Sequence, residues 1–285
     1  MALIDSLKVN GSTASSLVRE ALVSADIDMS TSQVSQLTMK FSDVGWPLLS
    51  SGLFNKGNSV DLPGFPMLVS AIDTTEVGGA AGFSIDCRPR SVQALKYRRG
   101  ARVMANVSPS EFVISECKAV GVSYVVQPSA RRTQVARDVP QPGQQETTTP
   151  PSSWTTFSRL ANEEGFIIFE AAGTIYFGRP SYFISIATEN VFVTYGAGET
   201  DPWKAMGLPD CHSSLDDTAV TVSAELAGSQ GPLVRCPKRL VLGGMSIFNG
   251  AYMITNVGLD AMNDSSNVSV SAGTPIDPHP NPPTE

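Results

Sequence analysis

The chain is short of charged residues, histidine and long apolar runs. Only 16% of its 285 residues are Asp, Glu, Lys or Arg, well below the roughly 25% of an ordinary soluble domain. Low charge together with many Gly, Ser, Thr and Val favours β-rich structure with surface buried between subunits. No run approaches about 18 unbroken apolar residues, so we expect no membrane span. Residues 1–7 lack the basic start of a signal peptide, which favours synthesis in the cytoplasm.

The residues that usually carry catalysis are also scarce. Of the two histidines, His279 lies in a proline-rich tail and His212 directly follows Cys211. Neighbours in sequence rarely reach the geometry of a nucleophile and its base. The cysteines form no CxxC pair, so we expect free thiols instead of a zinc site or a disulfide framework; they are Cys87, Cys117, Cys211 and Cys236. We predict no catalytic residue, no metal and no cofactor.

Short patterns that could indicate a hydrolase are weak. Ser115–Lys118 matches S-x-x-K, but the motifs that accompany it in serine acyltransferases are missing. The carboxylate pairs Glu163–Glu164 and Asp216–Asp217 are adjacent in sequence, and adjacent side chains on a helix point in different directions. P-loop, G-x-G-x-x-G and HExxH patterns are absent. A cell-wall hydrolase is therefore the least favoured function.

The charge balance argues against a protein that holds DNA. The net charge is −7, and affinity for phosphates comes from Lys and Arg. An acidic wall can instead let DNA pass without binding it. The local exception is the basic cluster Lys96, Arg98, Arg99 and Arg102, either a solvated surface or a contact for an acidic partner. Trp203 is a candidate anchor at an interface, because aromatic residues are enriched there.

Residues 1–105 read as a short helix followed by a first β portion. Leu17, Ala21, Leu22 and Ala25 predict an amphipathic helix within 12–25. From Val34 to Ser42 the period becomes two, which predicts a strand with Leu37, Met39 and Phe41 on its apolar face. Further strands are expected at 59–62, 67–72 and 82–88, and a short helix at 91–97.

Residues 106–182 predict an inserted α/β unit. Helices are expected at 108–120, ending at Gly121, and at 154–164, ending at Gly165. A strand follows the first helix at 123–127, and a tight hairpin around Ala172–Gly173 follows the second. Between the helices, residues 137–153 are rich in Pro, Gln and Thr without apolar periodicity, which predicts a long exposed loop.

The β pattern returns in residues 183–273. Strands are expected at 191–195, 218–224, 239–241, 251–259 and 266–272, with glycine-containing turns between them. The last segment, 274–285, carries five prolines and should be extended and partly disordered. We therefore expect a β-rich α+β fold, with two barrel-like β portions of the tail-tube type and a small inserted α/β unit.

Two segments carry a resemblance to a known family. Residues 153–169 read S-W-T-T-F-S-R-L-A-N-E-E-G-F-I-I-F and are followed by G-T-I-Y-F at 173–177. Residues 244–257 read G-M-S-I-F-N-G-A-Y-M-I-T-N-V. Both resemble phage baseplate hub and tail-tip hub proteins, the tail hub family that includes late control protein D. The resemblance assigns a structural motif role to Trp154, Phe157, Leu160, Ala161, Gly165, Phe166, Phe169 and Tyr252.

This resemblance implies a function without catalysis. A homotrimer would place its barrel-like portions around a three-fold axis as a ring, joining the hexameric tail tube to the central spike and leaving a lumen for DNA. The implied partners are the spike protein, the tube or tube-initiator protein and the baseplate wedge proteins, and the implied location is the virion tail. The alternative is a host-adhesion or carbohydrate-binding module of a virion, which β-rich, low-charge chains also suit.

Overall fold

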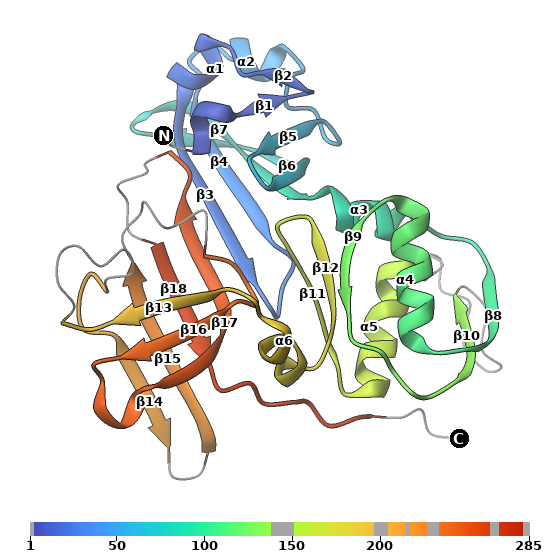
Figure 1. The fold of residues 1–285 in the computed structure, drawn as a ribbon. Helices are drawn as coiled ribbons and strands as arrows, with labels where there is room; N and C mark the ends of the chain where they lie inside the picture. Colours follow the sequence, from blue (N-terminus) through green and yellow to red (C-terminus); the bar gives the residue numbers. More distant parts are fainter. Residues whose placement is uncertain are drawn as a thin grey trace.

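The computed structural model describes residues 3–137, 151–196, 205–214, 217–226, 234–262 and 268–281. It confirms a β-rich α+β fold, in which a large sheet stands beside a smaller unit that carries the longer helices (Figure 1). Trp203 and all but the ends of the predicted loop 137–153 lie outside the described residues. No helix in the described part of the chain combines the length and apolar character needed to cross a membrane.

The first β portion forms one half of the large sheet. It contains η1 (Leu3–Ser6), β1 (Lys8–Val9), β2 (Ser12–Thr13), α1 (Ser16–Ala21), β3 (Leu22–Ser30), β4 (Gln36–Ser42), α2 (Pro47–Ser50), β5 (Ser59–Leu62), β6 (Phe65–Val77) and β7 (Ala80–Pro89). Its strands follow the order β3-β4-β7-β6-β5-β1-β2, all antiparallel.

The second β portion forms the other half. It contains β13 (Asn190–Thr194), β14 (Asp210–Ser214), β15 (Asp217–Leu226), β16 (Arg239–Gly243), η3 (Ser246–Phe248), β17 (Gly250–Asp260) and β18 (Val268–Gly273). Its main strand order is β14-β15-β18-β17. Strand β16 also pairs with β17, and β13 pairs with β16. Strand β17 also pairs antiparallel with β3, from Asn256–Ser30 to Asp260–Asp26. The two portions are therefore joined into one 13-stranded sheet.

A helical unit, from α3 to β12, lies between the two portions in sequence. It contains α3 (Arg90–Tyr97), β8 (Arg102–Val107), α4 (Pro109–Val120), β9 (Ser123–Val126), β10 (Thr133–Arg137), α5 (Ser153–Glu164), β11 (Ile167–Ala171) and β12 (Thr174–Gly178), and α6 (Pro180–Ile186) leads out of it. Its core includes Val92 and Leu95 from α3. The core of the helical unit thus includes residues that precede 106. The domain boundaries expected at 105, 182 and 273 stay predictions.

The β11–β12 hairpin separates the two hydrophobic cores. Ile175 and Phe177 belong to the core of the helical unit. Phe169 belongs to the core of the large sheet, and Tyr176, on the same face, stacks on it with ring centroids 4.9 Å apart. Because strand side chains alternate between faces, one hairpin serves as a wall of both cores.

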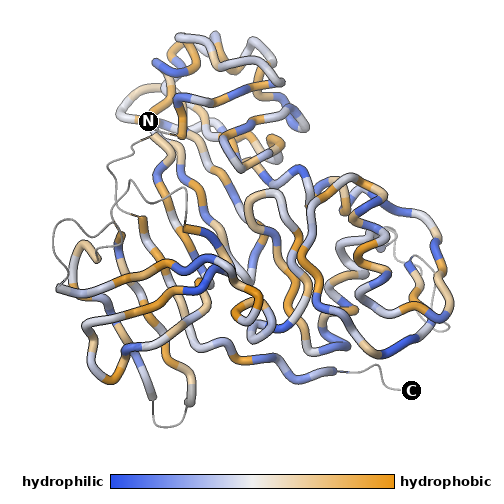
Figure 2. Tube along the Cα trace, viewed as in Figure 1, coloured by the Kyte–Doolittle hydropathy of each residue, from blue (hydrophilic) through white to orange (hydrophobic). Residues whose placement is uncertain are grey.

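Most predicted elements are confirmed, including the apolar face of β4, whose Leu37, Met39 and Phe41 are buried. Figure 2 shows this alternation of hydrophobic and hydrophilic residues along the central strands. Helix α4 begins at a capping box made by Ser108 and Glu111, and both α4 and α5 end at a left-handed glycine, Gly121 and Gly165.

The prediction of a helix within residues 12–25 was wrong in its extent. Helix α1 ends at Ala21, and Leu22 begins the nine-residue strand β3. Ala25, Ile27 and Met29 of that strand are buried at every second position. The apolar residues around Leu22–Ala25 fit both the helical period and the period of two. Pairing of β3 with β4 and β17 makes this segment a strand.

Candidate functional site

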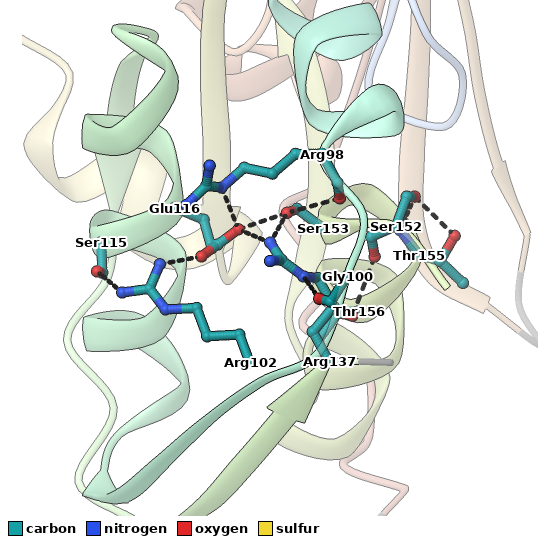
Figure 3. A network of polar contacts seen from close by, with 10 residues as sticks. All are labelled: Arg98, Gly100, Arg102, Ser115, Glu116, Arg137, Ser152, Ser153, Thr155 and Thr156. Atoms are coloured by element: carbon teal, nitrogen blue, oxygen red, sulfur yellow. Dashed lines mark hydrogen bonds and ion pairs between the residues drawn. The ribbon is translucent and has the colours of Figure 1, made fainter. Parts of the chain in front are cut away.

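The predicted basic cluster does not act as one surface. The side chains of Arg98 and Arg102 point inward to Glu116, as Figure 3 shows. Arg99 stays exposed and its Nε donates to the backbone oxygen of Lys96 at 3.4 Å. Two of its arginines therefore have an acidic contact within the chain, and a contact of the cluster with a partner protein stays a prediction.

Glu116 is the centre of a buried polar network on α4. Its side chain is 0% exposed and accepts from Arg98 Nε at 2.8 Å, from Arg102 and from Arg137. The Ser153 hydroxyl also donates to it. Arg137 donates through Nε to the Gly100 carbonyl at 3.0 Å, so the network binds the end of β10, the loop after α3 and the start of α5 to the same helix.

This network explains how a buried carboxylate is tolerated here. Burial alone would raise the pKa of Glu116, but hydrogen bonds from Ser153 and Arg98 and the charge of Arg137 lower the pKa below its ordinary value. The carboxylate is thus charged at neutral pH and neutralised by its arginines. Its contacts flank both ends of the segment 138–150, at Arg137 and Ser153.

The motif residues taken from the resemblance lie mainly in one core. Phe157, Leu160, Ala161 and Phe166 are buried in the helical unit, and Trp154 packs against them at its edge. In contrast, Phe169 and Tyr252 belong to the core of the large sheet. The Tyr252 hydroxyl donates to the Phe248 carbonyl at 2.7 Å, which closes the turn before β17.

Among the described residues, those weighed for catalysis are not assembled into a site; Asp216 and the side chain of Asp217 lie outside the described part. All four cysteines are free, and Cys87, Cys117 and Cys236 are buried. His212 is exposed on β14. Ser115, from the S-x-x-K pattern, accepts from Arg102 at 2.8 Å. Among the described residues, no group of three or more His, Cys, Asp or Glu side chains could hold a metal ion.

A second buried carboxyl sits where the hairpin meets the first β portion. Glu170 is 1% exposed; its Oε1 accepts from the Gly173 N–H at 2.5 Å. Its Oε2 has no hydrogen-bond partner among the residues that the structure describes. Burial raises the pKa of Glu170 to about 7, against the opposing effect of the Gly173 hydrogen bond. The Ser35 hydroxyl donates to the Glu170 backbone oxygen at 2.9 Å, which ties the hairpin to the loop before β4.

The large sheet has a polar outer face, opposite its core. Registered neighbours form rows across it, such as Asp260–Asp26–Thr38–Asp86. A second row runs through Glu225, Ser269, Gly258, Asp28 and Gln36. Both rows combine carboxylates with hydroxyl-bearing or small side chains, and the neighbouring row carries the exposed Lys40. Alternating polar positions in the sequence indicate this face within each single strand. They do not indicate which strands pair, so the continuous face could not be predicted from the sequence.

Two of the hollows in the described surface differ in character. The larger, about 600 Å³, lies between the β3–β4 turn and β17 and is polar; it is lined by Asp28, Ser30, Thr31, Ser32, Gln33, Val34, Gln36, Thr255 and Asn256. The smaller, about 230 Å³, lies beside α6 and is more apolar, with Tyr176, Phe183 and Ile186 in its wall. Neither hollow gathers the motif residues or the arginine network.

The fold is shared with solved phage tail proteins. No family model and no curated protein matches the sequence. The 43 kDa tail protein of prophage MuSo2 from Shewanella oneidensis superposes with a TM-score of 0.58 at 10% identity, over 94% of this chain and 96% of that one. A tail protein from Neisseria meningitidis MC58 gives 0.60 at 10% identity, over 94% and 95%.

A secretion-system protein has the same fold. The E. coli c3393 protein, a component of the type VI secretion system with structural similarity to T4 bacteriophage tail proteins gp27 and gp5, gives a TM-score of 0.62 at 13% identity, over 98% of this chain and 79% of that one. At such identities the likeness concerns the fold. The predicted likeness to phage tail proteins is confirmed at that level.

The Glu116 network makes a prediction about stability. We expect Glu116→Gln to lower the free energy of unfolding by about 3–5 kcal/mol, because it leaves buried arginine charge without its partner. Because the pKa of Glu116 is lowered in the folded protein, its stabilising effect is present above the unfolded-state pKa and is lost as pH falls through the folded-state value. Chemical denaturation measures both effects.

The matched control is Glu189→Gln. Glu189 also pairs with a cation, Lys238, but its side chain is 71% exposed. The denaturation midpoint of this variant should stay close to that of the unaltered protein. Equal midpoints for Glu116→Gln and Glu189→Gln would show that the Glu116 network does not hold the unit together.

The raised pKa of Glu170 predicts a pH dependence of stability opposite in sign to that of Glu116. A carboxyl with a raised folded-state pKa binds its proton more tightly when folded, so its contribution to stability falls as pH rises from about 4.5 to about 7. We expect Glu170→Gln to be more stable than the unaltered protein at pH 8, by up to roughly 3 kcal/mol, and equal to it at pH 4. Denaturation at both pH values, with exposed Glu76→Gln as control, checks this; a difference independent of pH would contradict it.

Proposed function

We propose that the protein is a non-enzymatic hub subunit of a phage-type tail baseplate or tail tip. Three copies form a ring that joins the hexameric tail tube to the central spike and leaves a lumen for DNA. The fold shared with phage tail proteins supports a structural role in such a machine. The tube or tube-initiator protein, the spike and the baseplate wedge proteins are the proposed partners.

The observation that carries this proposal is the polar outer face of the continuous sheet. Asp26, Asp28 and Asp73 are exposed on it, and small residues lie next to the last two, Gly258 beside Asp28 and Ser84 beside Asp73. Acidic and small side chains thus prevail over the cation Lys40 and the apolar Phe192, which are also exposed there, so the face offers few cations to phosphates. It suits the wall of a channel through which DNA passes without binding.

The ends of the sheet supply edges through which copies could join. Strand β14 pairs only with β15 among the described strands, and from Ser70 to Val77 strand β6 pairs only with β7. At these ends the core residues Cys211 and Ile72 are only partly buried. Pairing β14 of one copy with the open half of β6 in the next would cover both. It would also remove the exposed edges and close the ring.

The joint within the chain supports this arrangement. Strands β17 and β3 already connect the two portions by edge pairing, and the core face and outer face continue across them without a switch. A joint between copies made in the same way would extend the same two faces around the ring. The outer face would then become its inner wall.

A host-adhesion role is the second candidate, and the polar hollow beside β17 favours it. Hydroxyl, amide and carboxylate groups line that hollow and could bind the hydroxyls of a sugar. Its nine lining residues include no aromatic side chain on which a sugar ring could stack. The hub is therefore the better supported function.

Light scattering on the purified protein, alone and with its neighbouring tube and spike proteins, tests the hub. The expected mass is that of a trimer, about 90 kDa or three times 30.2 kDa, either alone or on addition of the spike. A monomer that binds neither partner would overturn the proposal. In that case a glycan array would test adhesion.

Cross-linking tests the edges separately. In a Cys211→Ser background, the double variant Asp73→Cys and His212→Cys places one thiol at each sheet end. We expect a short bismaleimide to join copies into covalent dimers and trimers. Each single variant, and His212→Cys combined with Glu20→Cys on α1, should remain unlinked. A trimer in solution that forms no cross-links would support the ring but rule out the contact between β14 of one copy and β6 of the next.

A further inference from the structure

We infer that residues 274–281, here termed the strap, form a latch that holds the helical unit against the second β portion. Closed as in this structure, it fixes the position of the unit; released at its far end, it lets the unit pivot about the β11–β12 hairpin, which stays packed in the core of the large sheet. The inference concerns this chain alone and does not depend on the ring. Figure 1 shows the strap running from β18 past α6 toward the lower end of the helical unit.

The near end of the strap is anchored in the large sheet. The Thr274 N–H donates to the Val220 carbonyl at 2.9 Å, and the Val220 N–H donates to the Thr274 hydroxyl at 2.9 Å. These contacts continue the pairing of β18 with β15 by one residue. The root of the strap therefore belongs to the second β portion.

The middle of the strap caps a helix from a distance. The residue before α6, Arg179, makes no capping hydrogen bond with its own side chain. Instead Asp277 accepts from the Ser181 N–H at 3.0 Å and from the Ser181 hydroxyl at 2.6 Å. A carboxylate that accepts from the first turn of a helix is favourable. The strap thus supplies the N-terminal capping hydrogen bond that the Arg179 side chain does not make.

The far end of the strap rests on the C-terminus of α5. The Asn281 N–H donates to the Asn162 carbonyl at 2.9 Å. A Cβ on Gly165 would lie 2.6 Å from the Pro278 oxygen and 2.8 Å from the Pro280 nitrogen. Gly165 therefore has two roles, as the left-handed cap of α5 and as the space into which the strap fits.

Composition and exposure suit a latch. Pro275, Pro278 and Pro280 restrict the strap to extended conformations, which lowers the entropy lost when it docks. The Asp277–Ser181 contact is exposed, and Pro278, Pro280 and Asn281 are exposed as well. The docking is thus polar and superficial, while the helical unit beneath it has a separate core of its own. Such a contact can open without unfolding either part.

A pair of glycines provides a matched test. Gly121 ends α4 as Gly165 ends α5, with φ of 69° against 66°, but no atom lies within 4 Å of a Cβ built on Gly121. Both Gly→Ala changes impose the same backbone strain, and only Gly165→Ala displaces the strap. The difference between the two variants therefore reports the latch.

The measurement is the distance between spin labels at Ala119→Cys in α4 and Ser223→Cys in β15, in a Cys211→Ser background. We expect Gly165→Ala to broaden and shift this distance distribution, and Gly121→Ala to leave it unchanged. Hydrogen exchange adds a second readout: Asp277→Ala should speed exchange in the first turn of α6 about fivefold through loss of its cap.

The outcomes separate clearly. Identical distance distributions in the two glycine variants would overturn the latch. If both glycine variants fail to fold, Asp277→Ala provides the test through the same labels. If Asp277→Ala speeds hydrogen exchange in α6 but leaves the distance between the spin labels unchanged, Asp277 is a helix cap only. This outcome would also reject the latch.

Discussion

The pairing of β3 with β17 is the constraint on which the rest of the structure depends. These strands come from opposite ends of the chain, and their register, from Asn256–Ser30 to Asp260–Asp26, aligns the core faces of two β portions. A slip of β17 by one residue against β3 would turn Leu259 outward and Asp260 into the core, while Ile27 and Asp26 kept their sides. The large buried cluster that spans both portions exists only in this register.

The same joint accounts for the position of the helical unit. Its hairpin packs Phe169 and Ala171 into the core of the sheet, while Ile175 and Phe177 close the core of the unit itself. The unit is therefore fixed to the sheet by one shared wall and, on the other side, by the strap. Within it, Glu116 on α4 replaces apolar packing with charge, because the loop after α3, β8 and β10 each bring an arginine to its carboxylate.

Elements with a single clear period could be predicted from the sequence. Strand β4 and helices α4 and α5 have alternating or helical apolar patterns and strong end signals, and they were found within one or two residues. Strand β14 was missed because Asp210–Ser214 has no apolar alternation, and α6 because seven residues contain too few turns. Glu116 could not be identified, since its arginine partners come from separate segments that only the fold assembles.

The outer face presents the remaining physical question, since like charges face each other on it. Asp26 and Asp260 are direct neighbours across the β3–β17 joint, and opposed like charges on paired strands reduce stability. A sheet selected for stability alone would place an opposite charge or a threonine pair at this position. The arrangement is understandable if the face must remain acidic and smooth for another reason. Under the proposed hub function, passage of a polyanion is such a reason, because cations on the wall would slow it; Lys40 is an exposed exception on this face.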